Sequence, residues 1–113
     1  MDKVTCYRQL VMQVMNEYID LMRHSSAETS HLHILYDEER DHYMLSTIGW
    51  EGKRRIRAIT VYVRLENEKI WIEEDLTDYS IASHLLALNV PKSDIVLAFH
   101  YPKFRPLTEF AVA

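Results

Sequence analysis

The 113-residue sequence predicts a single α+β domain spanning residues 1–113: an N-terminal helix, a four-stranded antiparallel meander, a second helix and C-terminal strands. Three observations lead to this fold class. Apolar residues recur with a helical period in residues 3–23 and again shortly after residue 77. Between these helices, apolar and polar residues alternate in short runs separated by charge clusters. The chain then ends on apolar runs at residues 95–99 and 108–112, where many domains carry a polar tail.

Residues 3–23 carry an apolar stripe along one face of the predicted first helix. Spacings of three and four residues align Val4, Tyr7, Val11, Val14, Tyr18 and Leu21. A second stripe, about 100° around the helix, consists of Met12, Met15, Ile19 and Met22. This apolar surface is wider than one sheet contact needs. Either the methionines fill the core, or Met12, Met15 and Met22 belong to a surface for a second copy or another partner.

Residues 24–28 lose the helical period and are predicted as a loop. The strands of the meander follow at residues 32–36, 42–50, 56–65 and 69–73. In the second strand, one predicted face carries Tyr43 and Leu45, and the other carries Met44, Ile48 and Trp50. In the third strand, strict alternation places four apolar side chains on one face: Ile59, Val61, Val63 and Leu65.

The second helix is predicted to begin after a cap at Asp75 or Thr77. Its apolar face consists of Ile81, Leu85 and Leu88. Asn89 ends it, because asparagine tolerates the left-handed conformation that often follows a helix, and Pro91 cannot continue the hydrogen-bond ladder. One helical turn is then expected at residues 91–94.

The C-terminal part is predicted to close the domain with two strands. Residues 95–99 are apolar on both faces, which indicates a buried strand. A basic link at residues 103–106 leads to the closing strand at residues 108–112. We expect these two runs to pair and to seal the C-terminus.

The net charge limits the function classes. Thirteen Lys and Arg against seventeen Asp and Glu give a formal charge of −4, which opposes tight non-specific DNA binding. One local basic patch consists of Lys53, Arg54, Arg55 and Arg57. It is interpreted either as a solvated turn and strand end or as a contact for an anion or a partner.

Cysteine content and hydropathy point to a cytoplasmic protein. Cys6 is the single cysteine and cannot pair within the chain, which favours a reducing compartment. No apolar run approaches the roughly 20 residues of a membrane span, and the first residues do not form a signal peptide. We therefore expect no membrane association.

A histidine pair and an acidic turn are candidate chemical sites. His31 and His33 point to one face of a strand and, with Asp37, form a possible metal set, or they are solvated side chains opposite the apolar face. The acidic turn at residues 37–42 places carboxylates beside His42, as acid-base chemistry requires, but such clusters are usually hairpin tips. With two glycines, Gly49 and Gly52, the chain has no phosphate-binding loop. We expect no catalytic set, no cofactor and no metal site.

The corner after the predicted buried strand is the first place to look for a binding surface. A residue at the end of a buried strand has a rigid support, and this corner gathers imidazole, phenol and basic groups. The candidate residues are His100, Tyr101, Lys103 and Arg105.

The chain resembles the XisI-like family, the fdxN element excision controlling factor proteins of cyanobacteria, essentially from end to end. Each mark of the resemblance is weak alone, and together they are specific. They are Tyr7-Arg8, residues 37–43, Gly49-Trp50, Lys69-Ile70-Trp71-Ile72, Ile81-Ala82, residues 90–100 and residues 108–113.

The resemblance implies a XisI-like fold and a part in programmed genome rearrangement. A separate recombinase excises the element, and the XisI-type protein controls excision alongside a XisH-like partner. The expected function is therefore that of a non-enzymatic accessory factor, a homo-oligomer that acts by protein-protein contact and meets DNA only indirectly. Two alternatives remain: a direct DNA-binding architectural factor using residues 53–57 and 103–105, and antitoxin-like restraint of a nuclease-fold partner.

Overall fold

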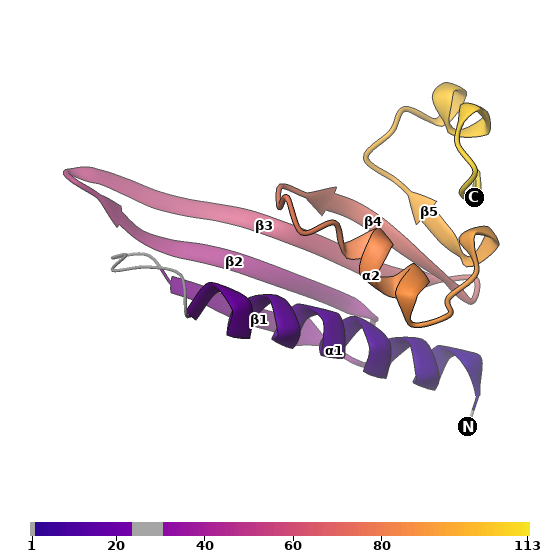
Figure 1. The fold of residues 1–113 in the computed structure, drawn as a ribbon, viewed down its shortest axis with the longest axis horizontal. Coiled ribbons are helices and arrows are strands. Elements are labelled where there is room, and N and C mark those ends of the chain that lie inside the picture. Colours follow the sequence, from indigo (N-terminus) through magenta and orange to yellow (C-terminus); the bar gives the residue numbers. More distant parts are fainter. Residues whose placement is uncertain (1, 24–30) are drawn as a thin grey trace.

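The computed structural model describes residues 2–23 and 31–113, and the loop predicted at residues 24–28 lies outside them. The elements follow one another along the chain as shown in Figure 1. They are α1 (Lys3–Arg23), β1 (His31–Asp37), β2 (His42–Glu51), β3 (Arg54–Glu66), β4 (Lys69–Asp75), α2 (Ile81–Ala87), the 3₁₀ helix η1 (Lys92–Asp94), β5 (Ile95–Leu97) and the 3₁₀ helix η2 (Pro102–Leu107).

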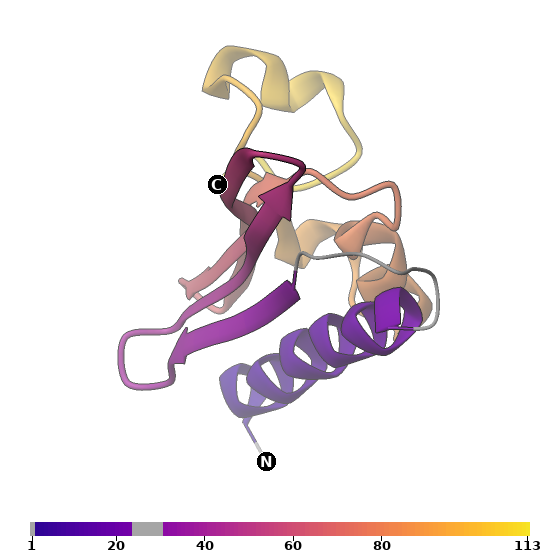
Figure 2. The same cartoon turned by 90° about the vertical axis from the view of Figure 1, so that its left-hand side faces the viewer.

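One five-stranded sheet with the order β1-β2-β3-β4-β5 forms the centre of the fold. The first four strands are antiparallel and β5 is parallel to β4, so the predicted meander is confirmed and gains one strand. Both helices lie on the same face of this sheet (Figure 2). We call this the inner face and the opposite one the outer face. The α+β class predicted from the sequence is therefore confirmed.

The core fills the space between the helices and the inner face. From α1 it takes Tyr7, Val11, Val14 and Met15, and from α2 it takes Ile81 and Leu85. The sheet contributes Tyr43, Leu45, Val61, Val63, Leu65, Ile70, Ile72 and Ile95. The apolar stripe of the first helix thus faces the core as its spacing predicts, except at Leu21, which is 51% exposed.

The methionines of α1 divide between core and rim. Met15 is completely buried, so its assignment to a partner surface is wrong. It lies one residue after Val14 and shares the part of α1 that meets both the sheet and α2. Met12 packs partly buried against the core, and Met22 is half-buried near the end of the helix.

A β-bulge at Thr60 reverses the faces of β3. Leu45 pairs with Val61, but the next residue of β2, Ser46, pairs with Ile59, so Thr60 is the extra residue. Its carbonyl accepts a hydrogen bond from Leu76 N at 2.9 Å. The prediction that Ile59 shares the face of Val61 is therefore wrong: Ile59 lies on the outer face and is 48% exposed.

The start of α2 differs from the prediction, and its end agrees with it. Ser80, not Asp75 or Thr77, is the cap, and its side chain accepts a hydrogen bond from Ser83 N. Asp75 instead holds the preceding loop, accepting from the backbone N–H groups of Thr77 and Ile81. After the helix, Asn89 adopts the expected left-handed conformation, with φ of 70°.

Replacing Asn89 with alanine is expected to lower the free energy of unfolding by about 1 kcal/mol, because a Cβ without a compensating polar group is strained at positive φ. Asn89→Gly is the matched control and should cost less than alanine, since glycine adopts this conformation without strain. Urea denaturation of the two variants gives the comparison. Equal free energies of unfolding for the two variants would show that the positive φ at position 89 does not disfavour alanine.

The C-terminal part departs most from the sequence prediction. The strand expected at residues 95–99 ends at Leu97, and Phe99 is 49% exposed. The strand expected at residues 108–112 is wrong: its pairing is reduced to one parallel bridge between Val96 and Ala111. The expected basic link is the helix η2, whereas the helical turn before β5 is confirmed as η1.

Candidate interaction surface

The C-terminal segment, residues 98–113, is fixed to the fold by Arg105. The three nitrogens of its guanidinium donate to three backbone carbonyls, those of His100 at 3.1 Å, Ala98 at 3.2 Å and Val112 at 3.2 Å. These carbonyls belong to both ends of the segment. Arg105, a candidate partner residue, therefore serves first as a brace inside its own segment.

Trp71 provides the platform on which this brace rests. The indole is 9% exposed although it does not belong to the inner-face core. Arg64 lies 4.7 Å and Arg105 5.9 Å from its ring, and its N–H donates to the carbonyl of Glu66 at 3.0 Å. Arg64 is itself paired with Glu66 at 2.8 Å. The segment thus sits on a rigid part of the outer face.

A row of large apolar side chains projects from this braced segment. Tyr101, Phe104 and Leu107 are 66%, 55% and 83% exposed. Their spacing of three residues matches the three-residue turn of η2, which aligns side chains at i and i+3. The rings of Tyr101 and Phe104 also contact each other, with centroids 5.9 Å apart. We name these three residues the C-terminal patch; contiguous exposed apolar surface of this kind marks interaction sites.

The candidate residues of this corner differ in exposure and in the contacts that they make. Tyr101 belongs to the patch, and Lys103 is exposed beside it. His100 is half-buried, with its ring 4.7 Å from that of Phe99. Sequence reasoning missed Phe104 and Leu107. Their spacing from Tyr101, between Pro102 and Pro106, was the signal that could have found them.

The second predicted surface, the basic patch, lies at the end of the β2–β3 hairpin. Lys53, Arg54, Arg55 and Arg57 are all exposed there. In Figure 1 the hairpin projects beyond α1, far from the C-terminal segment along the longest axis. The structure therefore does not join residues 53–57 and 103–105 into one basic surface.

The acidic turn holds two of its carboxylates, those of Asp37 and Asp41, in ion pairs. Arg8 donates to Asp41 through Nε at 2.6 Å and through a second nitrogen at 3.1 Å. The Tyr43 hydroxyl donates to the same carboxylate, and burial together with this bond raises the pKa of Tyr43 to about 12. Hydrogen bonds from the side chain and backbone of Arg40 lower the pKa of Asp37. Such groups are structural and poorly matched to acid-base work near neutral pH.

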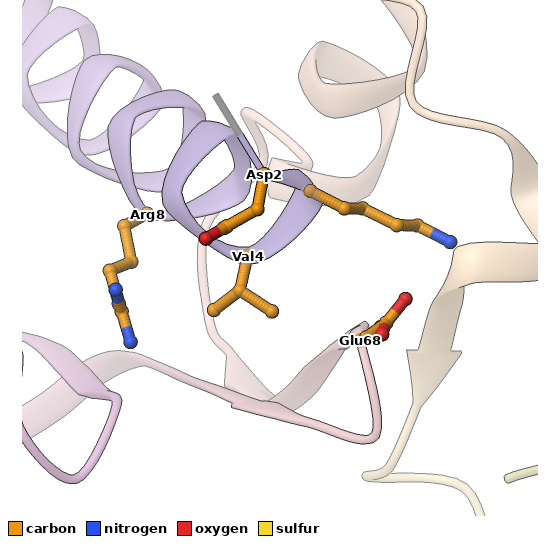
Figure 3. A pocket seen from close by; sticks show the side chains of 5 residues that line it. Asp2, Val4, Arg8 and Glu68 are labelled. Carbon is orange, nitrogen blue, oxygen red and sulfur yellow. The ribbon is translucent and has the colours of Figure 1, made fainter.

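A second buried polar cluster ties the start of α1 to η1. Asp94, 9% exposed, accepts hydrogen bonds from the Tyr7 hydroxyl and from Lys3, the latter at 2.8 Å. Beside it lies a hollow of about 480 Å³ lined by Asp2, Lys3, Val4, Arg8 and Glu68 (Figure 3). Charges of both signs line this hollow, and Lys3 and Arg8 are already paired with carboxylates.

His31, His33 and Asp37 do not assemble into a metal set. His31 and His33 are exposed on β1, and Asp37 lies four residues beyond His33, roughly 13 Å along an extended strand. The carboxylate of Asp37 accepts from Arg40 and from two backbone N–H groups of the turn. In residues 2–23 and 31–113, no group of three or more potential ligands is placed to hold a metal ion.

The fold and surface define a small α+β protein, with two helices on one face of a five-stranded sheet and a braced apolar row at the C-terminus. Residues 1–112 match the model of the family described as XisI protein. The chain belongs to the XisI family.

Solved structures agree with this membership. The fdxN element excision controlling factor XisI from Anabaena variabilis ATCC 29413 is 42% identical, with a TM-score of 0.84 over 99% of this chain and 100% of that one. A XisI-like protein from the same organism is 31% identical, with a TM-score of 0.87 over 97% and 99% of the two chains. No curated protein matches the chain.

In the described part of the chain, no helix combines the length and the apolar character needed to cross a membrane.

Proposed function

We propose that this protein is a cytoplasmic accessory factor that controls the excision of a DNA element, and that it acts by contact with a XisH-like protein rather than by catalysis. The 42%-identical relative is an excision controlling factor, which supports the general assignment. The XisH-like partner follows from the family resemblance. The C-terminal patch supplies a surface suited to such a contact.

The observation that carries the proposal is the exposure of the patch on a rigid support. Without a partner, Leu107 leaves a large apolar side chain 83% exposed to water. Arg105 and Trp71 hold the patch in place, so a partner would not need to order it on binding. Rigid aromatic and apolar groups at the centre of an interface usually carry most of its energy.

The test is a double substitution in the patch. Phe104→Ser with Leu107→Ser is expected to weaken association with a co-expressed XisH-like protein by about 30-fold or more, because hot-spot truncations cost about 2 kcal/mol or more. Titration of purified proteins measures the affinity, and size-exclusion chromatography reports the complex. The same chromatography gives the oligomeric state, for which we expect a homo-oligomer.

A control variant removes two exposed apolar side chains elsewhere. Leu21→Ser with Leu35→Ser changes one residue of α1 and one of β1, each 51% exposed, and should leave partner affinity unchanged. Neither double variant is expected to lose the fold, since surface substitutions usually have small effects on stability. The proposal fails if the unmodified protein does not associate with the partner, or if both variants weaken association equally.

A further inference from the structure

Basic residues are concentrated in one hairpin of this acidic protein. Residues 52–65 contain five Lys and Arg and no Asp or Glu. The remainder of the chain then holds eight Lys and Arg against seventeen Asp and Glu. Net charge alone, the reason for expecting only indirect DNA contact, does not describe this end of the molecule.

The bulge at Thr60 places Arg55 and Arg57 on the outer face of the hairpin. Trp50 pairs with Arg55 and Ile48 pairs with Arg57, and both pairs continue the outer face set by Ser46 and Ile59. Arg55 and Arg57 therefore point to the same side, about 7 Å apart along the strand. The helices lie on the opposite side of the sheet (Figure 2).

The positive charges of this face are available to a ligand. No ion pair joins Lys53, Arg55 or Arg57 to a carboxylate within residues 2–23 and 31–113, whereas Arg54 pairs with Glu51 at 3.1 Å. Arg55 lies 5.2 Å from the ring of Trp50 and donates to the carbonyl of Gly49 at 3.4 Å. These contacts order its guanidinium without neutralising it.

We infer that this outer face of the hairpin end, formed by Arg55 and Arg57 with Lys53 at the turn, binds the phosphate backbone of a nucleic acid. A nucleic-acid backbone carries regularly spaced phosphates, and a row of positive charges on one side of a projecting ribbon can neutralise several of them. A two-stranded β-ribbon also has dimensions that the major groove of DNA admits. The inference goes beyond the proposed function, which requires no contact with DNA.

The test measures binding of a short fluorescent duplex, and separately of one of its strands, across a series of salt concentrations. Binding is expected at low salt and should weaken steadily as salt rises. Arg55→Gln with Arg57→Gln should reduce the slope of log affinity against log salt by about 2 on duplex DNA, since each lost phosphate contact removes about 0.9. Comparison of the two probes shows whether the duplex or the single strand is preferred.

Arg40→Gln is the matched control, because Arg40 lies in the turn between β1 and β2 and is paired with Asp37 at 3.0 Å. It should leave the salt slope unchanged, and circular dichroism verifies that all variants are folded. Absence of binding to both probes at low salt overturns the inference, as does an equal slope for the double variant and the control. If the double variant instead loses only a protein partner, the face belongs to protein contact and the inference is also wrong.

Discussion

Trp71→Ala is expected to lower the free energy of unfolding by about 3–5 kcal/mol, the usual range for removing a buried aromatic side chain. Trp71 is 9% exposed, and the guanidinium groups of Arg64 and Arg105 lie 4.7 Å and 5.9 Å from its ring. Its loss would leave a cavity under the C-terminal segment and leave the Glu66 carbonyl without its hydrogen bond. We therefore expect residues 98–113 to become more accessible to proteases as well.

Urea denaturation followed by circular dichroism measures the stability, and limited proteolysis measures the release of the segment. Trp50→Ala is the matched control, because Trp50 is 50% exposed on the hairpin, and its effect should be much smaller. Trp71→Phe should fall between alanine and the unmodified protein, since it retains a ring. Similar losses for Trp71→Ala and Trp50→Ala would show that Trp71 does not hold the segment.

The second large effect concerns Asp94, whose carboxylate joins η1 to the first turn of α1. Asp94→Ala is expected to cost about 2–3 kcal/mol, because it leaves the buried Tyr7 hydroxyl without an acceptor and removes the charge that Lys3 contacts. The value lies below that of a fully buried ion pair because the side chain of Lys3 is 43% exposed. Denaturation at neutral pH measures it.

The same carboxylate gives the stability a dependence on acid pH. Burial by itself raises the pKa of Asp94, but the hydrogen bonds and positive charge of its neighbours, Lys3 above all, outweigh burial and lower the pKa below its ordinary 3.8. Its contribution is therefore fully present above about pH 3.8 and is lost as pH falls further, through the folded-state pKa. The stability of Asp94→Asn should fall less steeply in this range, and an identical acid limb in both proteins would contradict this account.

Features with a local cause were predictable from the sequence. The stripe of α1, the order of the first four strands and the left-handed Asn89 depend on residues close together in the chain. The burial of Met15 depends on how α1 meets α2. The helical spacing of the methionines alone fits both a core position and a rim position.

The bulge and the C-terminal patch depend on contacts that no local pattern records. Thr60 is a good strand former and carries no glycine or proline signal, so strict alternation was the natural but wrong prediction for Ile59. In the C-terminal part, Pro102 and Pro106 lack N–H donors, and Arg105 draws the chain back onto its own carbonyls. The choice of this corner as a binding surface stays a prediction, and its exposed apolar row was not predicted from the sequence.

The bulge at Thr60 makes strand register, rather than composition, decide which side chains the outer face of the hairpin presents. If Thr60 paired regularly with Ser46, the alternation of Val61 and Val63 would carry on unbroken toward the hairpin, and Arg55 and Arg57 would turn to the side that the helices occupy. A deletion of the Thr60 codon would remove the bulge and keep Ile59 paired with Ser46, so Arg55 and Arg57 would stay on the outer face. Related chains that differ by one residue in this strand should accordingly be compared by register before they are compared by sequence.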